Sequence, residues 1–402
     1  MIERPLGAGD PLFDGGIDLT VILIVVGKLL VTFGFLMVGV LFMVWFERKI
    51  IADMQNRIGP NRAGPFGLLQ ALADGTKLFF KEDLLPDRAE RRVFRLAPYV
   101  SVIPAFASFA IIPLGGQFRV AGHDTYLQLA DPPIGILFLL AMSSIAVYGV
   151  MLAGWSSGSK YPLLASVRAS AQMVSYEAAI NLAVVTSVLI AGSLSTRDIV
   201  NSQATWNWNL WQLGVVPFVI FLIAGTAESN RPPFDLVEAE QEIVGGYHTE
   251  YSSLRFAIFY LAEYMNVITI SAIAITLFLG GPNGPGIPVL PDLLDGVVWF
   301  VAKLLVFLFS YIWLRATLPR LRYDQLMNLG WKVLIPLALF WLLLIAALRV
   351  GRDAGWETPY IFVGALVIGY VCWAALGAAL RLGERAAAAA AGAGTPEEEA
   401  IA

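Results

Sequence analysis

The chain has very few of the side chains that bind metal ions. Its 402 residues include one cysteine, Cys372, and two histidines, His123 and His248. An iron-sulfur cluster needs about four cysteine thiolates or their histidine substitutes, so this set is too small for one. The two histidines lie in loops on opposite sides of the predicted apolar bundle, which excludes a haem held between them. We therefore expect no metal site in the chain, and any redox cofactor must belong to a partner protein.

Charged residues are also scarce, whereas hydrophobic residues are abundant. Only 14% of the residues are charged and 57% are hydrophobic, which is typical of a protein that folds in lipid. A helix of about 20 apolar residues spans a bilayer. Nine such stretches can be read, at 17–46, 96–114, 132–153, 170–192, 211–227, 255–280, 295–318, 331–349 and 359–380. The sequence therefore predicts an all-α polytopic membrane protein with about nine transmembrane helices. The first is too long and uninterrupted for a signal peptide.

Lysine and arginine are distributed unevenly among the connecting segments. Alternate connections, at 47–95, 154–169, 228–255 and 315–332 and after 380, together hold 20 of the 27 basic residues. The remaining connections hold five, and Lys28 and Lys303 fall within spans. Basic residues favour the cytoplasmic side of a membrane. We therefore expect a multi-pass protein of the bacterial cell membrane with its N-terminus outside and its C-terminus in the cytoplasm.

Two connections and the C-terminal tail have distinctive compositions. In the connection 47–95, the stretch GPFGLLQALADGTKLFFKE intersperses apolar with polar residues, which predicts an amphipathic helix in the membrane interface that starts near Pro65. An ordinary membrane-surface anchor is the alternative. Residues 386–402 are acidic and low in complexity, which predicts disorder. We expect a single membrane domain over 1–385, which includes a cytoplasmic acidic loop at 228–254.

Several carboxylates are predicted at membrane depth. Glu177 lies inside the fourth apolar stretch, Glu263 lies about two turns into the sixth, and Glu47 and Glu228 end the first and the fifth. A charge within the hydrocarbon costs about 2.5 kcal/mol or more on insertion scales, so such residues often mark an ion pathway. The alternatives are a single satisfied polar contact for Glu177 and snorkelling toward the headgroups for Glu47.

The stretch AESNRPPFDLVEAEQEIVGGYHTEY, residues 227–251, gathers five glutamates and an aspartate. Pro232 and Pro233 prevent the fifth helix from continuing. If a helix resumes near Phe234, Glu238 and Glu242 share a face four residues apart. Like charges there are destabilising unless one carboxylate holds a proton or a cation lies nearby. The pattern favours a shared protonation site, with a solvated acidic loop as the alternative.

Four long segments carry a family resemblance. They read FERKIIADMQNRIGPNRAGPFGLLQALADGTKLFFKED, WSSGSKYPLLASVRASAQMVSYE, AESNRPPFDLVEAEQEIVGGYHTEYSSLRFAIFYLAEYMN and WLRATLPRLRYDQLMNLGWK. These segments closely resemble the H subunit of bacterial NADH:quinone oxidoreductase, the respiratory complex I, which is the counterpart of mitochondrial NADH dehydrogenase subunit 1. The ninth apolar stretch and the tail lie outside the eight-helix core of that family.

The resemblance implies a membrane-arm subunit that forms the quinone access tunnel and an acidic funnel coupling quinone reduction to proton translocation. By position, the resemblance implies proton-coupling roles for Glu47, Glu177, Glu228, Asp235, Glu238, Glu240, Glu242 and Glu263. It implies quinone-tunnel positions for Arg48, Arg57, Phe234 and Arg315. No residue would act directly in a chemical step, and the chain would hold no metal and no redox cofactor of its own.

Partners and substrate follow from the same resemblance. Quinone would be the substrate, while FMN and iron-sulfur clusters would belong to partner subunits of the peripheral arm. The chain would also contact neighbouring membrane-arm subunits and lipids, and no nucleic acid. Two alternatives remain open: a quinone-independent homologue in a membrane-bound hydrogenase or formate hydrogenlyase complex, and a stand-alone secondary ion transporter.

Overall fold

The computed structural model describes residues 10–13, 16–204, 206–236, 243–286 and 291–355, with the single positions 363, 364, 367, 370 and 374. By its residue contacts, the chain divides into two compact units, residues 1–338 and 339–402. The helices are η1 (Pro11–Phe13), α1 (Leu19–Met54), η2 (Pro65–Gly67), α2 (Gln70–Phe79), α3 (Arg91–Phe109), α4 (Gly135–Ser156), α5 (Lys160–Ala191), α6 (Thr196–Ser202), α7 (Asn209–Gln212), α8 (Val215–Glu228), η3 (Gly246–His248), α10 (Ser253–Phe278), α11 (Asp292–Thr317), α12 (Tyr323–Leu329), the π-helical η4 (Gly330–Leu334) and α13 (Ile335–Asp353). The strands are β1 (Gln117–Val120) and β2 (His123–Tyr126).

Within the described part of the chain, six helical segments are long and apolar enough to cross a membrane. They are Leu19–Met54, Gly135–Ser156, Lys160–Ala191, Ser253–Phe278, Leu293–Thr317 and Tyr323–Asp353. Two more predicted spans are helical, as α3 with 19 residues and α8 with 14. The protein is therefore an all-α multi-pass membrane protein. Most of the ninth predicted span, the domain boundary at 385 and the acidic tail lie outside the described residues.

The helices extend beyond the apolar stretches that predicted them. α3 begins at Arg91 rather than at residue 96, and α5 begins at Lys160 rather than at residue 170. The added turns contain basic and polar residues that are also helical. Hydropathy thus located the apolar part of each helix and missed its polar start. The predicted amphipathic helix is confirmed as α2, with Pro65 in the preceding turn η2.

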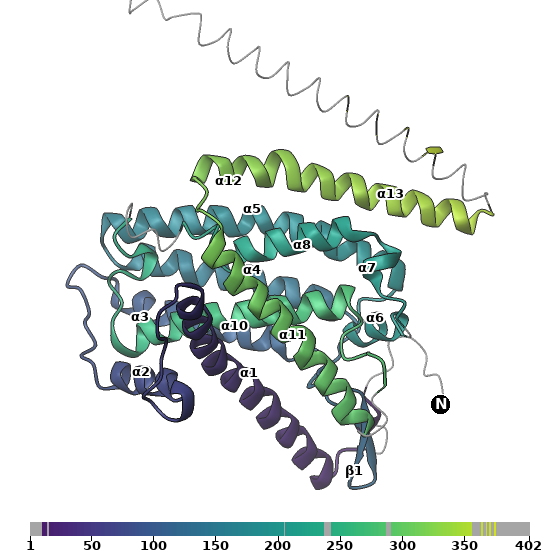
Figure 1. Cartoon of the computed structure of the whole chain (residues 1–402), viewed down its shortest axis with the longest axis horizontal. Coiled ribbons are helices and arrows are strands. Elements are labelled where there is room, and N and C mark those ends of the chain that lie inside the picture. The colour runs from purple at the N-terminus through teal and green to yellow at the C-terminus, as the bar shows by residue number, and fades with distance from the viewer. Residues whose placement is uncertain are drawn as a thin grey trace, which may run out of the picture. The chain divides into compact units, whose positions relative to one another are not determined.

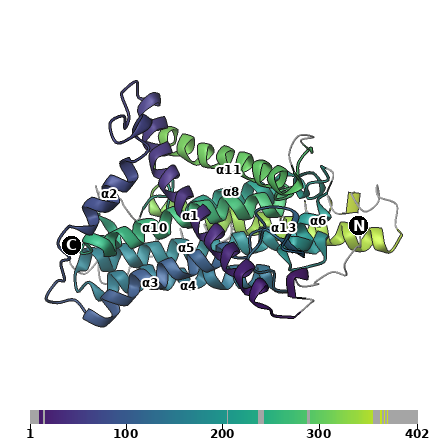
Figure 2. The same ribbon diagram turned by 90° about the horizontal axis from the view of Figure 1, so that it is seen from below.

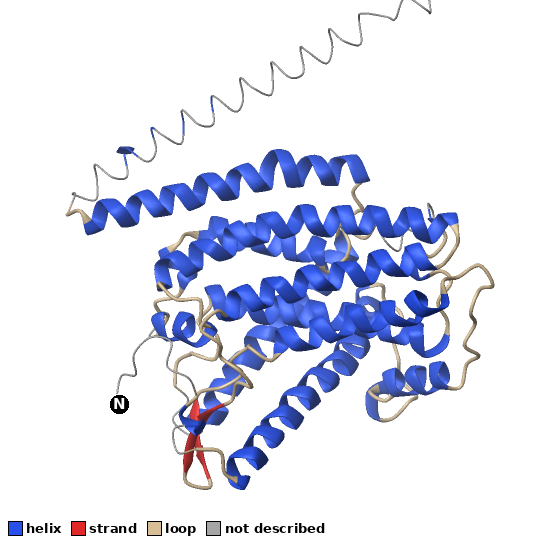
Figure 3. Ribbon diagram, turned by 180° about the vertical axis from the view of Figure 1, so that it is seen from behind, coloured by secondary structure: helices blue, strands red, loops and turns tan. Residues whose placement is uncertain are grey.

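A small antiparallel hairpin was absent from the sequence prediction. β1 pairs with β2 so that Val120 faces His123 and Gln117 faces Tyr126. The two residues between the strands, Ala121 and Gly122, have φ values of 49° and 87°, and positive φ at both positions is what a tight hairpin turn requires. Figure 3 shows the hairpin as the red element at one end of the bundle.

Helices of the first unit pack closely side by side. α3 lies along α4 and α10, and α4 lies along α5, which also packs on α8; Figure 2 shows α3, α4, α5 and α10 next to one another. Gly149 of α4 permits the approach to α3, because a Cβ atom there would lie 2.1 Å from Ser101 Oγ. Gly154 permits the approach to α5, where a Cβ atom would lie 2.4 Å from the Pro162 carbonyl oxygen. Polar side chains of the three helices are thereby brought within reach of one another.

Hydrogen bonds join the connections that the basic residues predict to be cytoplasmic. The Glu90 amide donates to the Ser156 carbonyl at 2.9 Å, and the Tyr251 hydroxyl donates to the Phe94 carbonyl at 3.1 Å. Two segments predicted to lie outside meet at Lys28 of α1. Its Nζ atom donates to Asp10, near the N-terminus, at 2.7 Å and to Thr125 of the hairpin at 3.1 Å. Figure 1 shows α2 and the hairpin at opposite ends of α1. The two predicted sets of connections therefore lie at opposite ends of this unit.

Candidate functional site

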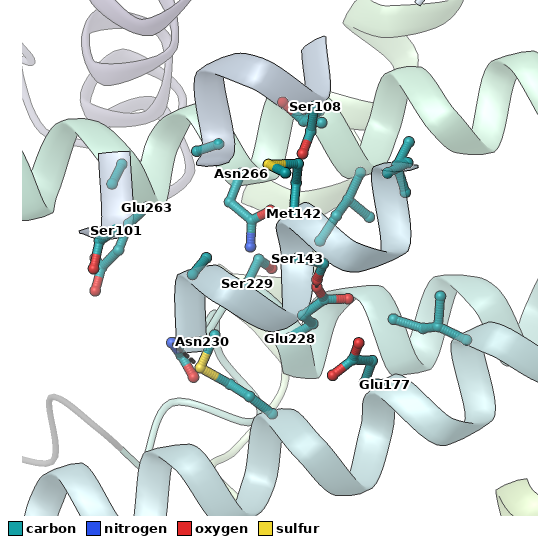
Figure 4. A pocket seen from close by; sticks show the side chains of 18 of the residues that line it. Ser101, Ser108, Met142, Ser143, Glu177, Glu228, Ser229, Asn230, Glu263 and Asn266 are labelled. Atoms are coloured by element: carbon teal, nitrogen blue, oxygen red, sulfur yellow. Dashed lines mark hydrogen bonds between the residues drawn. The ribbon is translucent and has the colours of Figure 1, made fainter. Parts of the chain in front are cut away.

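A cavity of about 70 Å³, lined by many apolar and some polar side chains, lies among α3, α4, α5, α8 and α10 in the first unit. Three of the predicted proton-coupling residues, Glu177, Glu228 and Glu263, line it. Figure 4 shows Glu177 and Glu228 next to each other and Glu263 farther away, beside Ser101. Glu177 and Glu228 are close enough to interact electrostatically. The structure thus brings together three carboxylates that the sequence placed in three different apolar segments.

Each of these carboxylates accepts a hydrogen bond from a neighbouring hydroxyl group. Ser143 donates to Glu228, and the adjacent Ser144 donates to Glu177. Tyr247 donates to Glu263 Oε1 at 3.0 Å. A buried charge requires compensation by hydrogen bonds or counter-charges. These hydroxyl groups therefore lower the free-energy cost of placing the carboxylates inside the bundle. None of the three donors was predicted from the sequence, although the Ser143–Ser144 pair stands out within an otherwise apolar stretch.

Additional oxygen atoms on the cavity wall are available for hydrogen bonding. Ser101 Oγ, Thr269 Oγ1 and Asn230 Oδ1 are buried and have no hydrogen-bond partner among the described residues. All three residues line the cavity. A cavity holds a water molecule when it offers roughly 10–15 Å³ of accessible space and two or more polar partners. The cavity therefore has the volume and the polar lining to hold several waters between the carboxylates.

Glu47, near the C-terminal end of α1, lies in a separate charged cluster. Its carboxylate forms an ion pair with Arg315 of α11 and accepts a hydrogen bond from the Tyr264 hydroxyl at 2.8 Å. Arg231 Nη1 is 4.0 Å from the same carboxylate, and the Arg231 guanidinium stacks 4.1 Å from the centre of the Tyr264 ring. Glu47 is 5% exposed, so these contacts hold it in the interior and exclude the snorkelling alternative. Arg231 and Tyr264 were absent from the predicted site.

The other two arginines assigned to the tunnel lie apart from both groups. Arg48 is 45% exposed and pairs with Asp74 of α2, with 2.5 Å between Nη1 and Oδ2. Arg57 is exposed, and its Nε donates to Gln55 Oε1 at 2.6 Å. Neither residue lines the carboxylate cavity or the small cavity beside Glu47. Arg48 links the amphipathic helix α2 to the end of α1.

The proline pair ends α8 as predicted, and the turn after it is buried. The Gln172 side chain donates to the Ala227 carbonyl at 2.8 Å and to the Phe234 carbonyl at 2.9 Å. The Phe234 ring lies 5.7 Å from the Tyr176 ring. Asp235 is 2% exposed and lies 3.6 Å from Arg320. Phe234 and Asp235 thus belong to a packed turn, whereas Glu238, Glu240 and Glu242 lie outside the described residues.

The acidic loop ends in a buried aromatic cluster. Burial lowers the pKa of His248 to about 4, so its imidazole is neutral at neutral pH. Burial raises the pKa of Tyr251 to about 12, opposed by a hydrogen bond with Ser156 and by the charge of Arg255. The Tyr251 ring stacks on Phe94 with 3.9 Å between ring centres. The end of the loop is therefore packed on the start of α3 by aromatic side chains that are uncharged at neutral pH.

Comparisons with known proteins show the family to which the chain belongs. The sequence profile of the family described as NADH dehydrogenase matches residues 27–346. A protein of Frankia alni, named as the H subunit of NADH-quinone oxidoreductase, is 54% identical over 349 residues, which cover 86% of this chain and 77% of the relative. A Frankia casuarinae protein of the same name is 53% identical over 354 residues, which cover 87% of this chain and 78% of the relative. The chain therefore belongs to the NADH dehydrogenase family, together with these H subunits of NADH-quinone oxidoreductase.

Proposed function

We propose that this chain is a membrane-arm subunit of a proton-pumping NADH:quinone oxidoreductase, in which it couples quinone reduction to proton translocation. The observation that carries the proposal is the convergence of Glu177, Glu228 and Glu263 on one cavity inside a bundle of apolar helices. Carboxylates that interact in a shared cavity titrate as a coupled group, and one of them holds its proton more firmly than an isolated carboxylate does. The family relationship supports the same function.

The quinone passage is proposed near the cytoplasmic end of α1. The segment from η2 through α2 exposes a set of apolar side chains, Phe66, Leu68, Leu72, Phe79 and Phe80. This segment is fixed to α1 by the Arg48–Asp74 pair and by a hydrogen bond from Trp45 Nε1 to the Phe66 carbonyl. An apolar surface in the interface suits an isoprenoid tail. The Glu47–Arg315 cluster offers charged groups and the Tyr264 hydroxyl, which could form hydrogen bonds with the polar quinone headgroup.

The redox chemistry is assigned to partners. In this proposal the FMN and iron-sulfur clusters are held by peripheral-arm subunits, and quinone is reduced where those subunits meet this chain. Across the described ranges, no group of three or more His, Cys, Asp or Glu residues is arranged to hold a metal ion. The chain then contributes binding, orientation and proton transfer. It lies in the bacterial cell membrane with its N-terminus outside.

The test replaces the cavity carboxylates in the assembled complex. Glu177→Gln and Glu228→Gln should leave NADH oxidation by an artificial acceptor unchanged, because that reaction bypasses the membrane arm. Quinone-linked proton pumping into inverted membrane vesicles should fall by about tenfold or more, since removal of a proton-transfer group typically costs that much. Asp124→Asn is the matched control, because Asp124 is an exposed hairpin carboxylate that is paired only with Arg119 in the described structure. Normal pumping in both glutamine variants would contradict the proposal.

The same preparation separates this function from a hydrogenase-type complex. The proposal predicts NADH-dependent reduction of an added quinone and co-purification with flavin and iron-sulfur subunits. A complex that assembles with this chain but reduces no quinone would favour the quinone-independent alternative. A chain that transports ions after purification by itself would favour a secondary transporter.

A further inference from the structure

Tyr247 connects the cytoplasmic loop to the carboxylate cavity. It lies in η3 at the end of the acidic loop, is 1% exposed, and lines the cavity. Its hydroxyl donates to Glu263 Oε1 at 3.0 Å. Glu263 belongs to α10, whereas Tyr247 belongs to a loop that precedes this helix. The hydroxyl therefore brings a cytoplasmic segment into direct contact with a carboxylate inside the bundle.

The surroundings of Tyr247 fix its side chain to the loop. Its ring packs edge-on against Phe259, with 5.2 Å between ring centres, and against His248, with 5.1 Å. Gly246, with φ at +76°, provides the backbone conformation that turns the chain into this position; side-chain-bearing residues rarely adopt it. The position of the hydroxyl is thus determined by the backbone of residues 245–249, because the ring has little room to move independently.

We propose that Tyr247 is a positioning residue that orients the Glu263 carboxylate for proton exchange and makes this orientation depend on the cytoplasmic loop. A hydrogen bond to a charged group is stronger than one between neutral groups, so withdrawal of the hydroxyl changes how firmly Glu263 holds a proton. A shift of the loop by an ångström or two would lengthen a 3.0 Å bond beyond hydrogen-bonding range. The inference rests on the proposed function, because it gives Glu263 a role in proton transfer.

Titratable groups near Tyr247 in the described structure include its neighbour in η3 and carboxylates of two other helices. His248 lies beside the ring, and Glu177 and Glu228 line the same cavity on α5 and α8. His248 is neutral at neutral pH because burial lowers its pKa to about 4. A change in pH dependence on removal of the Tyr247 hydroxyl can therefore be assigned by combining it with a Glu263 variant.

The test compares two tyrosines of the same loop. Tyr247→Phe removes the donor to Glu263 and keeps the ring. Tyr251→Phe removes a similarly buried hydroxyl, which donates to the Phe94 backbone and lies outside the cavity. Both variants remove a buried, hydrogen-bonded hydroxyl group and keep the ring, so a merely structural effect should be similar in the two. Each is made in the full complex, and assembly is checked by NADH oxidation with an artificial acceptor.

Only Tyr247→Phe should lower quinone-linked proton pumping, by several-fold, and only it should move the pH at which this activity is half-maximal. The expected displacement is on the order of one pH unit, as for the loss of one charge-assisted hydrogen bond. In a Glu263→Gln background, Tyr247→Phe should have no further effect on the pH profile. Equal profiles for the two tyrosine variants, or an undiminished effect of Tyr247→Phe in that background, would overturn the inference.

The outcomes also separate this inference from the proposed function. If Glu177→Gln, Glu228→Gln and Glu263→Gln lower pumping but Tyr247→Phe behaves like Tyr251→Phe, the positioning role fails and the proposed function stands. If all of the glutamine variants pump normally, the proposed function fails and the role of Tyr247 fails with it.

Discussion

Glu47 of α1 and Arg315 of α11 form an ion pair in the interior of the first unit, although they are distant in the sequence. Arg231, from the turn after α8, lies 4.0 Å from the same carboxylate. One anion therefore compensates two cations that come from different parts of the chain. This arrangement joins α1, α11 and the start of the acidic loop at a single point.

Glu47→Gln should destabilise the folded protein. Breaking a buried ion pair on one side costs about 3–5 kcal/mol, and the partial exposure of Arg315, 32%, reduces the expected cost to about 2–3 kcal/mol. The measurement is the midpoint temperature for thermal inactivation of quinone reduction in membranes, together with the amount of assembled complex. Arg48→Gln is the control, because the exposed Arg48–Asp74 pair should contribute about 1 kcal/mol or less. Equal midpoints for the two variants would show that the Glu47 cluster does not stabilise the bundle.

His248 should make the stability of the loop depend on pH. Its pKa is about 4 in the folded state and about 6.5 when exposed. Below pH 6.5 the unfolded chain binds a proton that the folded chain does not bind, so stability falls as the pH is lowered toward 4. The loss between pH 7.5 and pH 5.5 should be about 1 kcal/mol. His248→Phe should show a smaller decrease in thermal midpoint over this interval, whereas an unchanged decrease would assign the effect to other groups.

Glu240 and Glu242 lie outside the described residues, so their role stays a prediction from the sequence and the resemblance. Glu240→Gln and Glu242→Gln should preserve assembly and artificial-acceptor NADH oxidation, because neither property requires proton transfer in the membrane arm. Both variants should weaken quinone-coupled proton pumping. Pumping at the normal proton-to-electron ratio in both would remove these residues from the coupling mechanism.

The sequence predicted those parts of the site that depend on local pattern. A carboxylate within an apolar stretch can be recognised from the sequence alone, and Glu177 and Glu263 were identified in this way. The proline pair correctly predicted that α8 ends before it. The partners of these groups depend on tertiary packing. The sequence around Glu47 does not indicate that Arg315 and Tyr264 contact it. In the same way, the sequence around Lys28 does not indicate that Asp10 and Thr125 are its partners. The same reason explains Tyr247, whose contact with Glu263 requires the loop to turn back onto α10.

The serine pair of α4 gives the last prediction, because it was visible in the sequence but acquires its meaning from the fold. Ser143 and Ser144 are consecutive, and they donate to Glu228 and Glu177 on two different helices. The double variant Ser143→Ala, Ser144→Ala should preserve assembly, since alanine favours a helix and Ser143 lines a cavity that has room for water. Quinone-linked pumping should fall several-fold, because both carboxylates lose a donor that orients them. Ser310→Ala is the matched control, since the Ser310 hydroxyl is bound to the Val306 carbonyl of its own helix. Normal pumping in the double variant, with reduced pumping in Glu177→Gln, would show that the carboxylates transfer protons without help from α4.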